Sequence, residues 1–255
     1  MRLKDKIAVI TGGGGGIGRC AVRAFAREGA TVLIFDVDAQ AGAAAAEEVN
    51  RAGGRAQFYS VDISSFEAVR TAFAQIEQEY GGVDVLYNNA SVFWGKRDAA
   101  LDVLDMDTFE RIVRINLFGL VYCSKCAIPL MKKRGGGSII NTASSAGVIG
   151  IPKCDGYTAA KGGTVSLTRS MAVEFGPFNI RTNCIAPAAI RTPMVVESNL
   201  SDPEFDEQHF LTQGTPLRRW GEPEEIANVA LFLASGEAAY LNGAIIVADG
   251  GITVS

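Results

Sequence analysis

Short runs of apolar residues alternate along almost the whole chain with longer segments in which apolar positions recur at helical spacing. The short runs predict strands and the longer segments predict helices. Because strands that alternate with helices form parallel sheets covered on both faces, we expect an α/β fold with a doubly wound (Rossmann) parallel sheet of about seven strands. The predicted strands cover 6–11, 31–36, 56–60, 83–88, 137–143, 179–185 and 244–248, and the predicted helices cover 16–28, 38–52, 65–80, 107–134, 155–175, 223–235 and, less regularly, 197–213.

The chain is predicted to form one domain, because no repeat or low-complexity linker interrupts residues 1–255. Its least regular part is the proline-rich segment 186–221, which follows the sixth predicted strand. Long segments at such a place usually cover a ligand, because open α/β sheets bind ligands beyond the carboxyl ends of their strands. We predict a substrate lid near 188–215, with a surface insertion of no such role as the alternative.

A run of glycines, Thr11–Gly18, separates the first predicted strand from the first predicted helix. Glycines at this junction permit a tight turn, a close approach of the backbone to a pyrophosphate and close packing of the helix on the strand. The helix N-terminus adds unpaired N–H groups and the positive end of the helix dipole. The stretch therefore predicts a dinucleotide site. Two registers fit this spacing, Gly13, Gly15 and Gly18 or Gly12, Gly16 and Gly18.

The second predicted strand ends at Asp36, eighteen residues after Gly18. An acidic side chain at this offset bonds the adenosine ribose hydroxyls and repels a 2′-phosphate. No Arg or Lys stands at Val37 or Asp38, so NAD is favoured over NADP. Asp36 can instead serve a turn or a helix cap. Asp62, which precedes Ile63 after the third predicted strand, is expected to bond the adenine amino group or to make a turn.

Candidate chemistry lies at the start of the helix predicted over 155–175. Tyr157 and Lys161 are four residues apart and therefore share one helix face. A nearby ammonium lowers the pKa of a phenol, which brings tyrosine toward use as a general acid or base. Upstream, Ser144 and Ser145 follow a predicted strand, where a hydroxyl can polarise a substrate carbonyl. A turn or capping role is the alternative for either serine.

Composition narrows the function classes further. The 255 residues carry a net charge of −4, which argues against nucleic-acid binding. No run of 18 apolar residues predicts a membrane span, and the first residues lack a secretion signal, so a cytoplasmic protein is expected. The five cysteines are an odd number and there is one histidine, so no metal site is predicted. The spacing Cys123-x-x-Cys126 is interpreted as two small apolar residues on one helix rather than a metal or redox pair.

These features together resemble the short-chain dehydrogenase/reductase family in its compact single-domain branch, over essentially the whole chain. The resemblance rests on Thr11-Gly12-x-x-x-Gly16-Ile17-Gly18, Asn88-Asn89-Ala90, Asn116, Ser144, Tyr157-x-x-x-Lys161, Pro187, Ile190-x-Thr192-Pro193-Met194 and Asp249-Gly250-Gly251. It selects the register Gly12, Gly16 and Gly18, and leaves Gly13–Gly15 as the flexible middle of the turn.

The resemblance implies a catalytic set of Asn116, Ser144, Tyr157 and Lys161. Tyr157 would exchange the proton, Lys161 would bind the nicotinamide ribose and lower the pKa of Tyr157, Ser144 would orient the carbonyl, and Asn116 would support a proton-relay water. Asn89 would fix the central sheet. The implied cofactor-binding residues are Gly12, Gly16, Ile17, Gly18, Asp36, Asp62, Ile63, Asn89, Ala90, Tyr157, Lys161, Pro187, Ile190 and Thr192.

Two positions depart from the family pattern, which commonly has glycine at both. Ser91 follows Asn88-Asn89-Ala90, and Ala188 follows Pro187. Each extra Cβ is expected to narrow the cofactor path or shift a loop. Neither change removes a reacting group.

The expected function is hydride transfer between NAD and a secondary alcohol or ketone, neutral and apolar or cyclic. The alternatives are an NADP-dependent 3-oxoacyl-type reductase and a non-catalytic NAD-binding sensor. The helices 107–134 and 155–175 resemble those of the family's dimer contacts, so a homotetramer is expected. The candidate substrate pocket comprises Val92, Phe93, Trp94, Ser145, Val148, Cys154 and 189–213.

Overall fold

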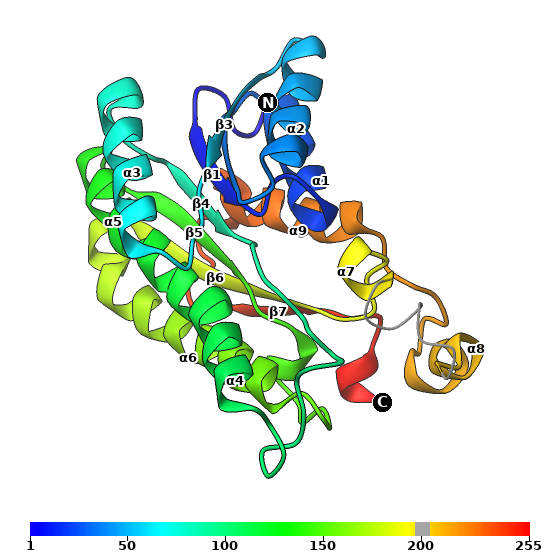
Figure 1. Ribbon diagram of the computed structural model, residues 1–255. Helices are drawn as coiled ribbons and strands as arrows, with labels where there is room; N and C mark the ends of the chain where they lie inside the picture. The colour runs from blue at the N-terminus through cyan, green and yellow to red at the C-terminus, as the bar shows by residue number, and fades with distance from the viewer. Residues whose placement is uncertain (197–204) are drawn as a thin grey trace.

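A seven-stranded parallel sheet forms the centre of the molecule, in the strand order β3-β2-β1-β4-β5-β6-β7. The computed structural model describes residues 1–196 and 205–255. This is the doubly wound arrangement that the alternation of apolar runs and helical segments predicts (Figure 1). The strands are β1 (Ile7–Thr11), β2 (Thr31–Asp36), β3 (Arg55–Ser60), β4 (Val85–Asn88), β5 (Gly137–Thr142), β6 (Ile180–Pro187) and β7 (Ile245–Ala248).

Helices cover both faces of the sheet (Figure 1). Alternate side chains of a strand point to opposite faces, so Ala8 and Ile10 pack in one core cluster and Val9 packs in the other. The layer on the first face comprises α1 (Gly16–Arg27), α2 (Ala39–Arg51) and α9 (Pro223–Ala234). The layer on the second face comprises α3 (Phe66–Tyr80), α5 (Gly119–Lys133) and α6 (Asp155–Phe175), and α4 (Met106–Val113) packs against α6.

The helix predicted over 107–134 contains a π-helical turn. Residues Arg114–Phe118 (η1) separate α4 from α5 without interrupting the helical path. Such single turns with an extra residue often occur at functional sites. The helix itself runs continuously over Met106–Lys133, as predicted over 107–134.

The helix predicted near 197–213 is only partly found. Residues 197–204 lie outside the described residues, and so does part of the predicted lid. The flanking residues form α7 (Pro193–Val195), α8 (Glu207–His209) and a π-helical turn, Phe210–Gly214.

By length and composition alone, the continuous helix Met106–Lys133 passes the test for a membrane span, with a mean hydropathy of 1.3. Its apolar residues have another use, because Cys123, Ala127 and Met131 are buried in the core cluster between the sheet and the second helical layer. Core helices of this kind meet the same length and hydropathy criteria, so this helix does not indicate a membrane protein.

The strand order reverses between β1 and β4. Strands on the two sides of this switch point are connected in opposite directions, which leaves a crevice beyond their carboxyl ends. The glycine turn after β1 and the loop after β4 both begin there.

Candidate active site

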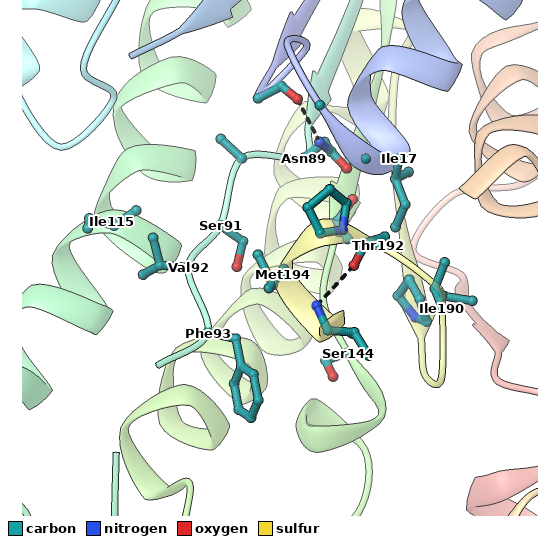
Figure 2. A pocket seen from close by; sticks show the side chains of 18 of the residues that line it. Ile17, Asn89, Ser91, Val92, Phe93, Ile115, Ser144, Ile190, Thr192 and Met194 are labelled. Carbon is teal, nitrogen blue, oxygen red and sulfur yellow. Dashed lines mark hydrogen bonds between the residues drawn. The ribbon is translucent and has the colours of Figure 1, made fainter. Parts of the chain in front are cut away.

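A cavity of about 690 Å³ lies beyond the carboxyl ends of the strands. The glycine turn lines one end of it, which we call the dinucleotide end, and Ser144, Tyr157 and Lys161 line the other, which we call the reaction end. Figure 2 shows Ser91, Ser144 and Met194 around this hollow, contributed by the loop after β4, the end of β5 and α7. All of the predicted cofactor-binding residues line the cavity except Gly18. Asn116 does not line it either, although its neighbour Ile115 does.

The glycine turn leaves the N-terminus of α1 without a side-chain cap and without an acidic residue in its first turn. Its N–H groups are therefore available to a pyrophosphate, so the donors present fit a dinucleotide. Gly12 adopts a left-handed φ of 66°, and a Cβ there would lie 2.9 Å from the Ala90 Cα. Gly18 allows close packing, because a Cβ there would lie 1.9 Å from the Gly12 carbonyl oxygen.

The expectation that Gly13–Gly15 form a flexible middle is wrong for two of the three residues. A Cβ on Gly13 would lie 2.8 Å from Cγ2 of Ile34, and Gly14 donates its N–H to Asp36 Oδ2 over 2.8 Å. Of these three residues, only Gly15 has no heavy atom within 4 Å of an added Cβ. Packing thus fixes most of the turn before any ligand binds.

Two carboxylates lie at the dinucleotide end, and both already make local hydrogen bonds. Asp36 Oδ1 accepts from the N–H of Asp38 over 3.0 Å, in addition to the bond from Gly14. Asp62 Oδ1 accepts from both the N–H and the hydroxyl of Ser64. A carboxylate has about four acceptor sites, so these bonds leave room for ribose or adenine donors. The predicted ligand role and the turn role are therefore compatible for both residues.

The end of β4 is tied to the strands on both sides of it. Asn89 donates to the Thr11 carbonyl over 3.2 Å, and the N–H groups of Asn89 and Ala90 both donate to the Thr11 hydroxyl over 3.0 Å. Asn89 thus holds the glycine turn, whereas it is Asn88 that crosses to β5 by donating to Asn141 over 2.9 Å. Both residues therefore tie the end of β4 to a neighbouring strand, Asn89 to β1 and Asn88 to β5, which is compatible with the sheet-fixing role expected of Asn89.

Asn116 sits in the π-helical turn and is buried. Its amide makes two hydrogen bonds with the backbone of Val92, accepting from the N–H and donating to the carbonyl, each over 2.8 Å. The extra residue of the turn aims this side chain at the loop after β4 rather than along the helix. The geometry therefore gives Asn116 a support role for that loop.

Lys161 is 1% exposed, and its Nζ donates to the Thr142 carbonyl over 2.9 Å. Burial without a counter-charge lowers the pKa of Lys161 to about 8. Burial of the phenol raises the pKa of Tyr157 to about 12, and interactions with the Ser144 and Ser91 side chains oppose this rise. The expected lowering of the pKa of Tyr157 by Lys161 is not found, because burial dominates for both groups.

Ser144 and Ser145 both line the cavity, but they differ in their surroundings. Ser145 is buried, and Ser144 is partly exposed and interacts with the phenol of Tyr157. The hydroxyl of Ser144 also accepts from the N–H of Ala146 over 3.2 Å, which leaves its own proton free to be donated. The preference for Ser144 over Ser145 agrees with this geometry.

Asp98 supports this site, and the sequence analysis missed it. Its carboxylate is buried and accepts from the N–H groups of Gly156 and Tyr157, over 3.0 and 2.8 Å. It thereby caps the helix α6, which carries Tyr157 and Lys161, from a distant loop. An Asp directly before the first residue of a helix signals a cap in sequence, whereas a cap from 58 residues away leaves no such signal.

The far wall of the cavity comes from Pro187, the last residue of β6, and from Ile190, Thr192 and Phe210 in the segment that follows. This segment is fastened near its ends, because Arg191 and the Trp220 indole N–H both bond Glu207 Oε1. The extra Cβ of Ala188 causes no left-handed strain; it is Ala189 that adopts a positive φ of 53°.

The six individually predicted substrate-pocket side chains divide into two groups. Val92, Phe93, Ser145 and Cys154 line the cavity. Trp94 instead contacts the guanidinium groups of Arg97 and Arg111, which lie 5.7 and 5.3 Å from its ring centre, and Val148 is exposed. Phe93 packs edge-on against the ring of Tyr157, with 5.0 Å between the centres.

All five cysteines are free thiols. Burial raises the pKa of Cys123, so this thiol has little thiolate character. Within residues 1–196 and 205–255, no three His, Cys, Asp or Glu side chains are grouped so as to hold a metal ion.

Comparison with known proteins agrees with this geometry. A family model described as enoyl-(acyl carrier protein) reductase matches residues 13–253. An uncharacterized oxidoreductase of Bacillus subtilis is 40% identical, covering 98% of this chain and 92% of that protein. A 3-oxoacyl-[acyl-carrier-protein] reductase of Thermotoga maritima is 35% identical over 100% of both chains. A 2,5-dichloro-2,5-cyclohexadiene-1,4-diol dehydrogenase of Sphingobium indicum is 37% identical over 98% of both.

Solved structures show the same fold. Levodione reductase superposes with a TM-score of 0.94 at 34% identity, over 100% of both chains. A gluconate 5-dehydrogenase from Burkholderia cenocepacia in complex with NADP and tartrate has a TM-score of 0.92 at 32% identity, over 100% of this chain and 97% of that one. Carveol dehydrogenase from Mycobacterium avium in complex with NAD has a TM-score of 0.94 at 29% identity, over 100% of this chain and 99% of that one.

Proposed function

The chain belongs to the short-chain dehydrogenase/reductase family, and we propose that within this family it is an NAD(H)-dependent enzyme that interconverts a neutral, largely apolar secondary alcohol and its ketone. The observation that carries the proposal is the placement of Tyr157, Ser144 and Lys161 at one end of a cavity whose other end is an uncapped helix N-terminus. A proton donor, a carbonyl-polarising hydroxyl and a phosphate site are then aligned within one crevice.

The charge of the dinucleotide end supports NAD over NADP. Among the described residues that line the cavity, the carboxylates are Asp36, Asp38 and Asp62, and the one cation is Lys161 at the opposite end. A 2′-phosphate near Asp36 would meet carboxylates and no guanidinium or ammonium group to pair with. Relatives of this fold include complexes with either nucleotide, so the preference rests on these side chains.

The reaction needs a proton and a hydride at the same carbonyl. The bound nicotinamide ring supplies or accepts the hydride. In the reductive direction Tyr157 gives its phenolic proton to the carbonyl oxygen, and in the oxidative direction it takes that proton back. Ser144 donates a hydrogen bond to the same oxygen and stabilises its developing negative charge. Because burial raises the pKa of Tyr157 to about 12, the phenol is protonated at neutral pH and ready for reduction.

Lys161 contributes in two ways. Its Nζ donates to the Thr142 carbonyl and the residue lines the cavity, which supports the proposed role of bonding the ribose hydroxyls of the nicotinamide half. In its charged form it favours the tyrosinate that follows proton transfer.

The lining of the reaction end supports the proposed substrate class. Val92, Phe93, Ile115, Ile151 and Met194 supply apolar surface, and no arginine lines the described cavity to hold a carboxylate or phosphate. A relative named for a cyclohexadiene diol supports a cyclic substrate.

A spectrophotometric assay with NADH and NADPH against a panel of cyclic and aromatic ketones and alcohols tests the proposal. We expect turnover with NADH on neutral ketones, little with NADPH, and no turnover in Tyr157→Phe, which should still bind NADH. Full activity of Tyr157→Phe, or a strong preference for phosphorylated or carrier-linked substrates, would overturn it.

An NADP-dependent 3-oxoacyl reductase is the second candidate. The matching family model and the Thermotoga relative both carry acyl-carrier names. Acetoacetyl thioesters with NADPH belong in the same panel, and a preference for them over ketones with NADH would select this candidate. A non-catalytic NAD sensor is disfavoured because Asn116, Ser144, Tyr157 and Lys161 are all present.

The assembly proposed for the protein is a cytoplasmic homotetramer. Phe118, which is 41% exposed, contacts Tyr122, and Tyr122 contacts Phe66, so an aromatic cluster reaches the surface of α3 and α5. On the nearby helix α6, Val173 is 80% exposed. Light scattering of the purified protein tests the state, and a monomer would contradict it.

A further inference from the structure

Ser91 is the residue that replaces the glycine usual in related sequences, and its hydroxyl is anomalous. The Oγ atom is buried and has no hydrogen-bond partner within the described part of the chain. Buried hydroxyls without a partner are uncommon and cost free energy, so each calls for an explanation. Ser91 lines the same cavity as Tyr157 and Ser144, and Figure 2 shows its side chain at the hollow beside Met194.

The backbone holds this side chain in place from both sides. The preceding residue, Ala90, donates its N–H to the Thr11 hydroxyl over 3.0 Å. The following residue, Val92, makes two hydrogen bonds with the Asn116 amide, each over 2.8 Å. The position of Ser91 is therefore fixed by the same polar contacts that hold the loop after β4, and its O–H is left to rotate toward whichever acceptor the cavity offers.

The loop that carries Ser91 packs against Tyr157, because the ring of Phe93, two residues further along, lies edge-on against the tyrosine ring with 5.0 Å between the centres. We therefore take the Tyr157 phenol as the acceptor that the cavity offers to Ser91. Ser91 and Ser144 are the two side chains whose interaction with this phenol acts to lower the pKa of Tyr157, against the rise caused by burial. A phenolate oxygen accepts more than one hydrogen bond, whereas a phenol uses its proton as a donor. A hydroxyl without a partner beside the phenol is thus suited to the charged form.

We propose, resting on the function inferred above, that Ser91 is a further catalytic residue, whose hydroxyl donates a hydrogen bond to the Tyr157 oxygen when that oxygen has lost its proton. In reduction the Tyr157 O–H bond breaks, the proton joins the substrate oxygen as the hydride reaches the carbon, and the Ser91 O–H turns toward the phenolate. Ser91 keeps its own proton throughout. In oxidation the same bond stabilises the base before it accepts a proton.

A glycine at position 91 lacks this donor, so the residue distinguishes this chain from the common family pattern. It also matters that the Ser91 hydroxyl has no hydrogen-bond partner before proton transfer. The hydrogen bond is made only after charge develops, so it stabilises the transition state more than the ground state.

The test compares Ser91→Ala, Ser91→Gly and Ser91→Thr with the wild-type protein. Ser138→Ala is the matched control, because its buried hydroxyl bonds the Leu233 carbonyl at the opposite end of β5. The titration of Tyr157 is followed by NMR of ring-labelled tyrosine in the NAD⁺-bound protein, and the signal among the six tyrosines is assigned by its loss in Tyr157→Phe. The pH profile of kcat/KM for alcohol oxidation and the Kd for NADH are measured on the same samples.

We expect Ser91→Ala and Ser91→Gly to move the Tyr157 titration and the acid limb of the oxidation profile upward by roughly one pH unit, as the loss of one hydrogen bond to a charged group implies. Oxidation near neutral pH falls roughly tenfold, whereas Ser91→Thr and Ser138→Ala keep the wild-type midpoint. The Kd for NADH is unchanged, and the thermal midpoint of Ser91→Ala is at or above that of the wild type, because no hydrogen bond is lost in the resting protein.

An unchanged Tyr157 titration in Ser91→Ala would overturn the proposal, as would a weaker Kd for NADH or a higher KM with no shift of the acid limb, which would assign the hydroxyl to cofactor or substrate. The NMR titration needs no substrate. If the wild-type protein oxidised no alcohol and reduced no ketone, the proposed function would fail by itself, while the titration would still decide whether Ser91 bonds the phenolate.

Discussion

The two ends of the cavity are built in opposite ways. At the dinucleotide end, one continuous stretch supplies the turn, and packing and local hydrogen bonds, such as that from Gly14 to Asp36, already hold it in place, while the N-terminus of α1 has no side-chain cap. At the reaction end, Asp98, Asn116, Ser144 and Tyr157–Lys161 arrive from four separate places in the chain. There the phenol and the ammonium are buried without a counter-charge, and their pKa values of about 12 and about 8 record the cost.

This difference shows where the fold gives up stability for chemistry. Packing and local hydrogen bonds set the dinucleotide end before a ligand arrives, so its residues stabilise the folded chain as well as the complex. The reaction end instead keeps Lys161 and the Ser91 hydroxyl in surroundings that an apolar residue would tolerate better. Functional residues commonly cost stability in this way. Substitutions at the dinucleotide end should therefore tend to lower stability, whereas removal of the Lys161 ammonium or the Ser91 hydroxyl at the reaction end should lower activity without lowering stability.

Replacement of Lys161 by methionine should have the largest effect. We expect turnover to fall roughly 10³-fold or more, because the charge that favours tyrosinate and the ribose donor are both lost. Stability should rise instead. Below about pH 8 Lys161 is charged in both states, and a pKa lowered from 10.5 to about 8 corresponds to a cost of folding of about 3 kcal/mol at most. Denaturant unfolding and steady-state kinetics measure the two effects.

The burial of Lys161 also predicts how the stability of the wild-type protein changes with pH. Between about pH 8 and 10.5 the unfolded wild-type chain binds the proton that the folded chain has released, so wild-type stability rises with pH in this window. Lys161→Met should lack that rise, and the exposed Lys125→Met should retain it. Equal slopes in the two variants would show that the ammonium is not buried uncompensated.

Asp98→Ala should have the next largest effect, and it should lower turnover and stability together. It leaves the buried N–H groups of Gly156 and Tyr157 without their acceptor, which costs roughly 2–3 kcal/mol. We expect kcat to fall tens of fold through displacement of Tyr157, with little change in the Kd for NADH. Asp98→Asn keeps one acceptor oxygen and should recover part of the stability and part of kcat. Asp102→Ala, at an exposed position, should change neither stability nor kcat. A stability loss with unaltered kcat would confine Asp98 to a structural role.

The contrast between the two ends also decides what the sequence reveals. The glycine turn, Asp36 and the pair Tyr157 and Lys161 are close in sequence or sit at fixed offsets, so spacing alone predicts them. Asp98 caps a helix 58 residues away, and the π-helical turn that aims Asn116 at Val92 depends on tertiary contacts. The prediction that Lys161 lowers the pKa of Tyr157 was wrong for the same reason. The pKa depends on how deeply the phenol is buried, and the i,i+4 spacing of the two residues does not reveal burial.

Asp36→Ser tests the charge of the dinucleotide end. Loss of the carboxylate should weaken NADH binding several-fold, because a hydrogen-bond acceptor for the ribose hydroxyls is lost. The preference for NADH over NADPH should fall by roughly tenfold, because the carboxylate no longer repels the 2′-phosphate. The fold should be retained, because Asp36 lies at a partly exposed turn and the hydrogen bonds that are lost there can be replaced by water. Paired kcat/KM values with NADH and NADPH are the measurement, and an unchanged ratio would place the source of selectivity elsewhere.

The smallest effect is expected within the glycine turn itself, where two adjacent residues form a matched pair. An added Cβ on Gly14 would lie 2.9 Å from Asp36 Oδ2 and 3.0 Å from the Ala41 Cβ, so Gly14→Ala should cost roughly 1–3 kcal/mol of stability. Gly15 has an extended φ of −147° and open space around an added Cβ, so Gly15→Ala should change stability by less than about 0.5 kcal/mol.

Because Gly15 lines the cavity at the N-terminus of α1, its methyl group should instead obstruct the pyrophosphate and weaken NADH binding. Thermal unfolding without nucleotide, together with NADH titration, distinguishes the two variants. Equal destabilisation by both would mean that the turn owes its shape to glycine at every position. A loss confined to Gly14 would mean that contacts with β2 and α2 hold the turn, and that Gly15 alone is kept open for the phosphates.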